Sequence, residues 1–165
     1  MTRRFAADTA VPMDRSISEI RTTVRRYGAT EFAHMESDAQ AAITFTMRGR
    51  RIFFRLAMPD PRARQFTHTE ARSQPRTAAA AHEAWEQACR SRWRALALVI
   101  KAKLEAVEVG IVVFEDEFLA NTMPPGASVT FGEAVRENMR LAHENGALTP
   151  LLPHIRPNGG TDATG

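Results

Sequence analysis

One apolar stripe on a long α-helix, within residues 77–111, constrains the fold of this chain more than any other feature. Its members recur at steps of three and four residues and are Trp85, Cys89, Trp93, Leu96, Ile100, Leu104, Val107 and Ile111. This spacing puts all of them on one helical face. No Gly or Pro interrupts residues 77–109, and Thr77 can cap the first turn. Because such a helix measures about 50 Å, we expect it to bend or to protrude from the domain.

Ahead of this helix, residues 30–58 follow the period-two pattern of β-strands. The predicted strands are residues 31–35, 40–48 and 51–58. Gly49 and Arg50 form the predicted hairpin turn, with Gly supplying the unusual backbone angle. Alternation predicts one core face, made of Ile43, Phe45, Met47, Ile52, Phe54, Leu56 and Met58. The intervening side chains, Arg48 and Arg51 among them, are predicted to face outward.

Two segments have the pattern of a capping box, in which a Ser or Thr is followed three residues later by Glu. Ser16 and Glu19 predict a helix over residues 16–27, which Gly28 ends. Thr130 and Glu133 predict a second helix that runs to about residue 145. A short helix is expected at 111–121, and Leu148, Leu151 and Leu152 are expected to form an extended strap on the core.

These elements predict an α+β fold, in which a three-stranded antiparallel meander packs on one long α-helix. A short N-terminal helix and C-terminal helices complete the expected core. The length favours a single domain over residues 14–155, with a flexible arm at 1–13 and a disordered tail at 156–165.

Positive charge is concentrated in the half of the chain that contains the predicted sheet. Residues 1–80 hold 14 arginines against 8 acidic residues, whereas residues 81–165 hold 8 basic against 11 acidic residues. Such an asymmetry can steer an anionic partner. Arginine supplies nearly all of the basic residues, a bias that a GC-rich genome also produces.

The candidate site is the outer face of the meander together with the loop that follows it. Three guanidiniums are predicted around an exposed aromatic ring, namely Arg48, Arg51 and Arg55 around Phe53. In the polar loop at 59–76, Arg62 and Arg64 would extend this track. Guanidinium–phosphate contacts beside an aromatic platform are what single-stranded nucleic acid requires.

No motif predicts catalysis, a cofactor or a metal. No two of the five histidines lie at i,i+4 on one helix, and the single Cys89 excludes an intramolecular disulfide. His68 is the histidine of most interest, because it lies in the arginine-rich loop. The triplet Glu115, Asp116 and Glu117 cannot converge on one ion, because neighbouring helical residues diverge by about 100°. We therefore expect a protein that is not an enzyme.

The segment WEQACRSRWRALALVIKAKLEAVEVGI, followed by FEDEFLA, resembles a recurring pattern in uncharacterised proteins of tailed bacteriophages and prophages. The upstream VPMDRSISEIRTTVRRYGA and FTHT also resemble that group, so the resemblance covers residues 11–122. It implies a phage context and no established activity. The predicted order of elements is also similar to that of single-strand annealing proteins, in which a basic hairpin and a long helix line a groove for DNA.

The leading expectation is a phage accessory protein that binds nucleic acid, single-stranded DNA in particular, in the host cytoplasm. The alternative is a protein-binding phage factor, such as an inhibitor of a host defence or an assembly protein, which uses the same surface. The apolar stripe could also extend into a seam between two copies. The N-terminus lacks the apolar core of a signal peptide, and no apolar run is long enough to span a bilayer.

Overall fold

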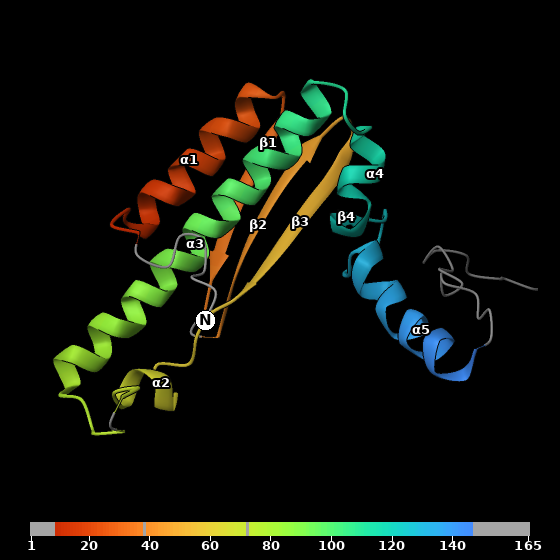
Figure 1. Ribbon diagram of the computed structural model, residues 1–165. Coiled ribbons are helices and arrows are strands. Elements are labelled where there is room, and N and C mark those ends of the chain that lie inside the picture. Colours follow the sequence, from red (N-terminus) through yellow and green to blue (C-terminus); the bar gives the residue numbers. More distant parts are fainter. Residues whose placement is uncertain (1–8, 38, 72, 147–165) are drawn as a thin grey trace, which may run out of the picture.

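The computed structural model describes residues 9–37, 39–71 and 73–146, and it confirms the α+β fold (Figure 1). Four antiparallel strands form one sheet in the order β1-β2-β3-β4. The strands are β1 Glu31–Glu36, β2 Gln40–Met47, β3 Arg50–Ala57 and β4 Thr122–Met123. The helices are α1 Met13–Arg26, α2 Arg64–Thr67, α3 Ala78–Glu108, α4 Phe114–Phe118, the 3₁₀ turn η1 Leu119–Asn121 and α5 Phe131–Asn145. The two-residue β4 was not predicted.

The long helix α3 confirms the predicted stripe, which packs into the core. Thr77 caps it, since the Thr77 hydroxyl accepts the Ala80 N–H at 3.3 Å. The buried residues are Cys89, Trp93, Leu96, Ala97, Ile100 and Leu104. Its first turns are exposed and extend past the sheet beside α2, so the expected protruding end is the N-terminal one (Figure 1). Ile111 is not part of the stripe, because the helix ends at Glu108 and leaves Ile111 75% exposed.

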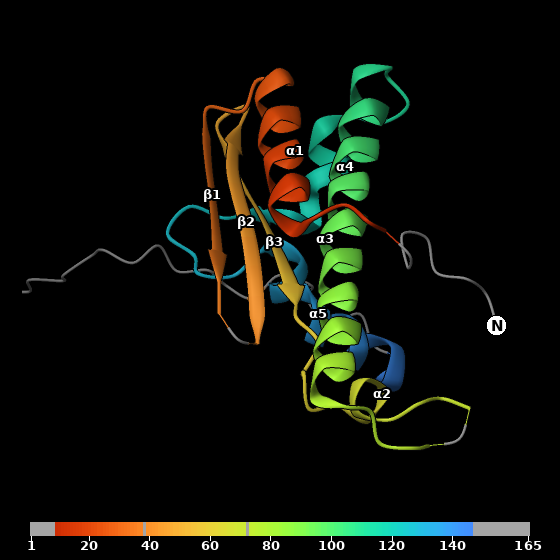
Figure 2. The same cartoon turned by 90° about the vertical axis from the view of Figure 1, so that its left-hand side faces the viewer.

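The helices α1, α3 and α4 all lie on one side of the sheet (Figure 2). They enclose the core with the inner face of β2 and β3, where Ile43, Phe45, Ile52 and Phe54 are buried. Among the described residues, no helix packs across the opposite, outer face, and the loop at 124–130 swings out on that side (Figure 2). The predicted alternation is therefore confirmed, and the sheet has one covered face and one open face.

The turn between β2 and β3 is one residue earlier than predicted. Arg48 and Gly49 both have positive φ, of 50° and 73°, as the two central residues of a tight hairpin turn require. Met47 pairs with Arg50 directly after the turn. The prediction of Gly49-Arg50 was wrong because Arg48 takes a left-handed conformation that most side chains avoid.

Of the two predicted capping boxes, only the second exists. The Thr130 hydroxyl accepts the Glu133 N–H at 3.2 Å, and the Glu133 carboxylate accepts the Thr130 N–H at 2.8 Å. The helix α1 instead begins at Met13 after Pro12, so Ser16 lies inside it and is fully buried. Glu19 does not reach back along α1, because it forms an ion pair with Arg94 of α3 at 2.5 Å.

The loop at 59–76 is more ordered than its composition suggests. It contains α2, whose Phe66 is buried, and His68 pairs with Pro75 in an isolated bridge. The predicted strap of three leucines, the predicted tail and residues 1–8 of the predicted arm lie outside the described residues.

Candidate functional site

The outer face of the sheet is built from side chains that alternate with the buried ones. Strand register brings Thr46 beside Arg51 and Thr44 beside Phe53, while Arg51 pairs with Met123 of β4. The β1 side chains in the same rows are Glu31, Ala33 and Met35. This face therefore combines a guanidinium, an aromatic ring and two threonines on one open surface.

Arg51 and Phe53 lie on this surface, as predicted. Arg51 is exposed, and within the described residues no hydrogen bond or ion pair holds its guanidinium. Phe53 is half-buried. Both line a shallow hollow of about 370 Å³ that extends across β1 and β2 to Met35. Among the described residues, Arg51 is therefore an exposed guanidinium without a partner on this face.

A second hollow, of about 680 Å³, adjoins the first, because Arg51 and Met123 line both. It lies between the β2–β3 turn and the loop after β4, and Phe131 at the start of α5 closes one side. Arg50 also lines it and forms an ion pair with Glu115 at 3.0 Å. The two hollows therefore meet at Arg51 and Met123, at the edge of the outer face.

Arg55 is on the outer face as predicted, but it is already engaged. Its guanidinium lies 4.9 Å from the centre of the Phe53 ring and forms an ion pair with Glu133 of α5 at 2.5 Å. Burial alone would raise the pKa of the Glu133 carboxyl. The Thr130 backbone N–H and Arg55 outweigh burial and hold that pKa below its ordinary value. Arg55 therefore ties α5 to the sheet and covers part of Phe53.

Arg48 is not on the outer face, because it belongs to the turn and not to the strand. Its guanidinium lies 5.1 Å from the centre of the Phe114 ring of α4, on the helix-covered side. The predicted cluster of Arg48 with Arg51 and Phe53 is therefore wrong. The position of the turn is the cause, since β2 ends at Met47 and Arg48, with positive φ, no longer follows the alternation of the strand.

Arg62 and Arg64 do not extend the track either. Both are exposed, but they follow β3, whereas Arg51 lies at its start, so a strand of eight residues separates them. The Arg62 N–H donates to Asp60 Oδ1 at 2.9 Å, and Arg64 begins α2. The predicted residues thus fall into three places, and only Arg51, Phe53 and Arg55 share a surface.

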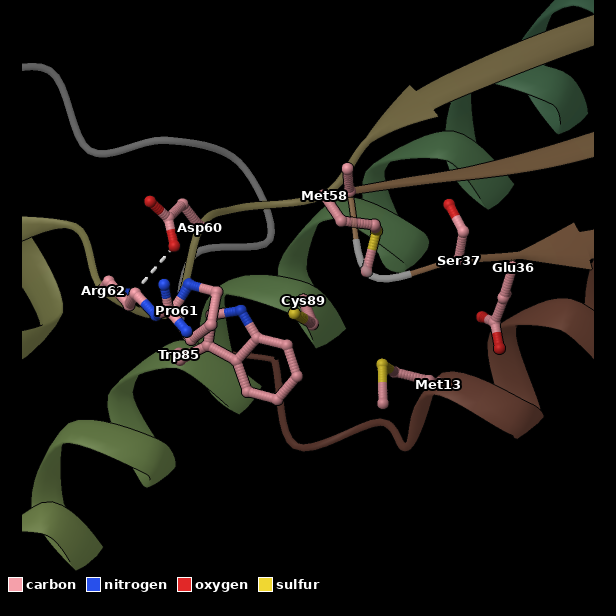
Figure 3. Close-up of a pocket in the computed structure, with 10 residues that line it drawn as sticks. Met13, Glu36, Ser37, Met58, Asp60, Pro61, Arg62, Trp85 and Cys89 are labelled. Carbon is pink, nitrogen blue, oxygen red and sulfur yellow. Dashed lines mark hydrogen bonds between the residues drawn. The ribbon is translucent and has the colours of Figure 1, made fainter.

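Sequence reasoning missed a pocket of about 750 Å³ at the far end of the sheet (Figure 3). Four segments line it: the start of α1, the β1–β2 turn, the loop after β3, and α3. Met13, Met58 and Cys89 lie between Trp85 and the side chains of the β1–β2 turn (Figure 3). Because these segments are far apart in the chain, no local pattern could have indicated the pocket.

Comparison of the chain with models of protein families, with curated proteins and with solved structures found no match. In the described ranges, no group of three or more His, Cys, Asp or Glu side chains could hold a metal ion. No helix of that same part of the chain is long and apolar enough to cross a membrane. The function proposed below therefore rests on the geometry of the outer face.

Proposed function

We propose that this chain binds single-stranded nucleic acid, without catalysis, on the open face of its sheet. The observation that carries the proposal is the pair Arg51 and Phe53, two residues apart on one strand face. Arg51 is a guanidinium that no described residue engages, and Phe53 supplies an aromatic ring. The proposal includes a phage context, which rests on the resemblance of residues 11–122 to bacteriophage and prophage proteins. Arg48, Arg62 and Arg64 have no part in this revised site.

The chemistry of the pair fits an unpaired strand better than a duplex. A base stacks on an aromatic ring only when its flat face is exposed, as it is in single strands. Arg51 would contact a phosphate. Thr44 and Thr46 line the same hollow, where the Thr46 hydroxyl donates to the Glu31 carboxylate at 2.8 Å. The adjoining hollow beside Phe131 would let the strand continue past Arg51 toward β4.

A protein partner is the second candidate, and one observation favours it. Met35 is 49% exposed in the same hollow, and Met, Arg and Phe are enriched at protein interfaces. A protein interface of this kind would depend much less on salt than a phosphate-binding one. The contact between two copies of the chain through the apolar stripe of α3 stays a prediction.

The test is fluorescence anisotropy of a labelled oligothymidylate of roughly 30 nucleotides and of a matched duplex. Wild type should bind the single strand more tightly, and affinity should fall by roughly threefold between about 50 and about 200 mM salt for the one Arg51–phosphate contact. Phe53→Leu keeps an apolar side chain but removes the ring, so it should weaken binding to the single strand. The absence of binding at low salt by correctly folded protein would refute the proposal.

A further inference from the structure

We propose that the pocket at the far end of the sheet binds an amphipathic organic cation, an ammonium group carried on an apolar or aromatic chain. The pocket lies at the α1–α3 side of the sheet, away from Arg51 and Phe53, so the inference is independent of the nucleic-acid proposal. Its volume of about 750 Å³ falls within the range of small-molecule sites, roughly 300–1,000 Å³.

The middle of the pocket is apolar and polarisable. Met13 and Met58 contribute thioethers, and Cys89 is fully buried between the two ends (Figure 3). Burial raises the pKa of the Cys89 thiol, so this side chain is a neutral thiol at physiological pH. These groups suit a hydrocarbon chain or an aromatic ring and offer no charge to it.

Trp85 is held in place and presents its ring to the pocket. The Trp85 Nε1–H donates to the Pro59 carbonyl at 2.7 Å, so its polar atom is already satisfied. His82, one turn earlier on α3, stacks on the same ring with 5.5 Å between the ring centres. The indole therefore offers π surface, which attracts a cation placed over it.

Two carboxylates stand on opposite sides of this apolar middle, Glu36 from the end of β1 and Asp60 from the loop after β3 (Figure 3). Asp60 Oδ1 accepts the Arg62 N–H, which orients the carboxylate and leaves its second oxygen available. Within the described residues, neither carboxylate has an ion-pair partner. Unpaired carboxylates at the rim of an apolar pocket attract a positive charge.

Among the described residues, Arg62 is the one basic side chain that lines the pocket. Changing it tests the sign of the ligand's charge. Among the lining side chains, two carboxylates outweigh one guanidinium, so an ammonium is favoured over a carboxylate or a phosphate. Outside the lining, the charges of Arg92 and Arg90 also act on Cys89 and are opposed by Glu86, and the Arg92 guanidinium donates to the Ala57 carbonyl. If the ligand is a cation, neutralising Arg62 should strengthen binding. If the ligand is an anion, the same change should abolish binding.

The experiment uses the indole N–H signals of ¹⁵N-labelled protein, since Trp85 lines the pocket and Trp93 is fully buried in the core. Three probes share one hydrocarbon and differ in charge: 4-phenylbutylammonium, 4-phenylbutanol and 4-phenylbutyrate. We expect the ammonium to shift the Trp85 signal saturably and to bind most tightly. The alcohol binding equally well, the carboxylate binding best, or an unmoved Trp85 signal would each overturn the proposal.

Variants then test which charged side chains of the pocket contribute to ammonium binding. Glu36→Gln and Asp60→Asn should each weaken ammonium binding by about fivefold or more, and Arg62→Gln should strengthen it. Asp116→Asn on α4 makes the same charge change outside the pocket and should have no effect. Unchanged affinity in both pocket-acid variants would contradict the assignment.

A lysine side chain of a partner protein carries the same chemistry as a free amine. The peptide acetyl-Gly-Lys-Gly-amide, titrated beside 4-phenylbutylammonium, separates the two sources. Tighter binding of the peptide would assign the pocket to a partner's lysine, and tighter binding of the free amine would assign it to a small molecule. Binding of neither would overturn the proposal.

Discussion

The two faces of one sheet, carried by the same two strands, have opposite roles in this molecule. On the inner face, Phe45 and Phe54 are buried, and the Phe118 ring lies 6.4 Å from each, edge-on. On the outer face, Arg51 is exposed and Phe53 half-buried, and no helix of the described residues packs across that face. The inner residues are explained by packing alone. The outer residues contribute little to the core, and the proposed nucleic-acid site rests on them.

The largest predicted effect is a difference in the free energy of unfolding between a substitution on the inner face and one on the outer face. Phe45→Ala should lower the free energy of unfolding by about 3–5 kcal/mol, because it leaves a cavity beneath α4. Phe53→Ala should cost about 1 kcal/mol or less, since its ring is only partly buried. Urea unfolding of both variants checks this difference. Equal losses would mean that the outer face is also part of the core.

The second prediction concerns the contact that ties α5 to the outer face. Glu133→Gln should lower stability by about 1 kcal/mol at neutral pH, because it weakens the cap and the ion pair with Arg55. The pKa of Glu133 is depressed in the folded state, so this stabilisation exists above the ordinary carboxyl pKa. It is lost as the pH falls through the folded value.

Urea unfolding at neutral and acidic pH measures this dependence. The difference between wild type and Glu133→Gln should shrink toward acid. Glu144→Gln makes the same charge change at the exposed end of α5 and serves as the control. A difference that stays constant with pH, or that matches the control, would show that the contact contributes nothing through its charge.

The smallest effect is expected at Ser16, whose hydroxyl is buried behind the inner face without a hydrogen-bond partner in the described part of the chain. Ser16→Ala should leave stability within about 0.5 kcal/mol of wild type or raise it, because it removes an unsatisfied polar group. A loss of about 1 kcal/mol would instead be the signature of a helix cap. Thermal unfolding distinguishes the two.

Ser16 also shows how far the sequence could predict this fold. The pattern Ser-x-x-Glu occurs at 16–19 and its Thr counterpart at 130–133, yet only the second is a cap. Pro12 starts α1 one turn earlier, and Arg94, distant in the chain, takes the Glu19 carboxylate. Periodicity over many residues predicted α3 and the sheet, whereas local motifs depended on partners that the sequence does not place.

The same contrast between regular periodicity and local motifs applies to the candidate site. Alternation along β3 correctly put Arg51, Phe53 and Arg55 on one face, because a period of two is fixed by the strand itself. The position of Arg48 depended on a single residue of turn register. The engagement of Arg55 by Glu133 depended on a contact between residues 78 positions apart. Four segments line the pocket beside Trp85, and no single one of them has a sequence pattern that predicts it.

The most direct test of the proposed site compares Arg51→Ala with Arg48→Ala. Each variant removes one positive charge, from the outer face at Arg51 and from the helix-covered side at Arg48. Binding of labelled oligothymidylate is measured by anisotropy over a series of salt concentrations. Arg51→Ala should weaken binding and reduce the slope of log affinity against log salt by about 1, whereas Arg48→Ala should change neither. Equal effects of the two variants, or an effect of Arg48→Ala alone, would contradict a nucleic-acid site on the open face.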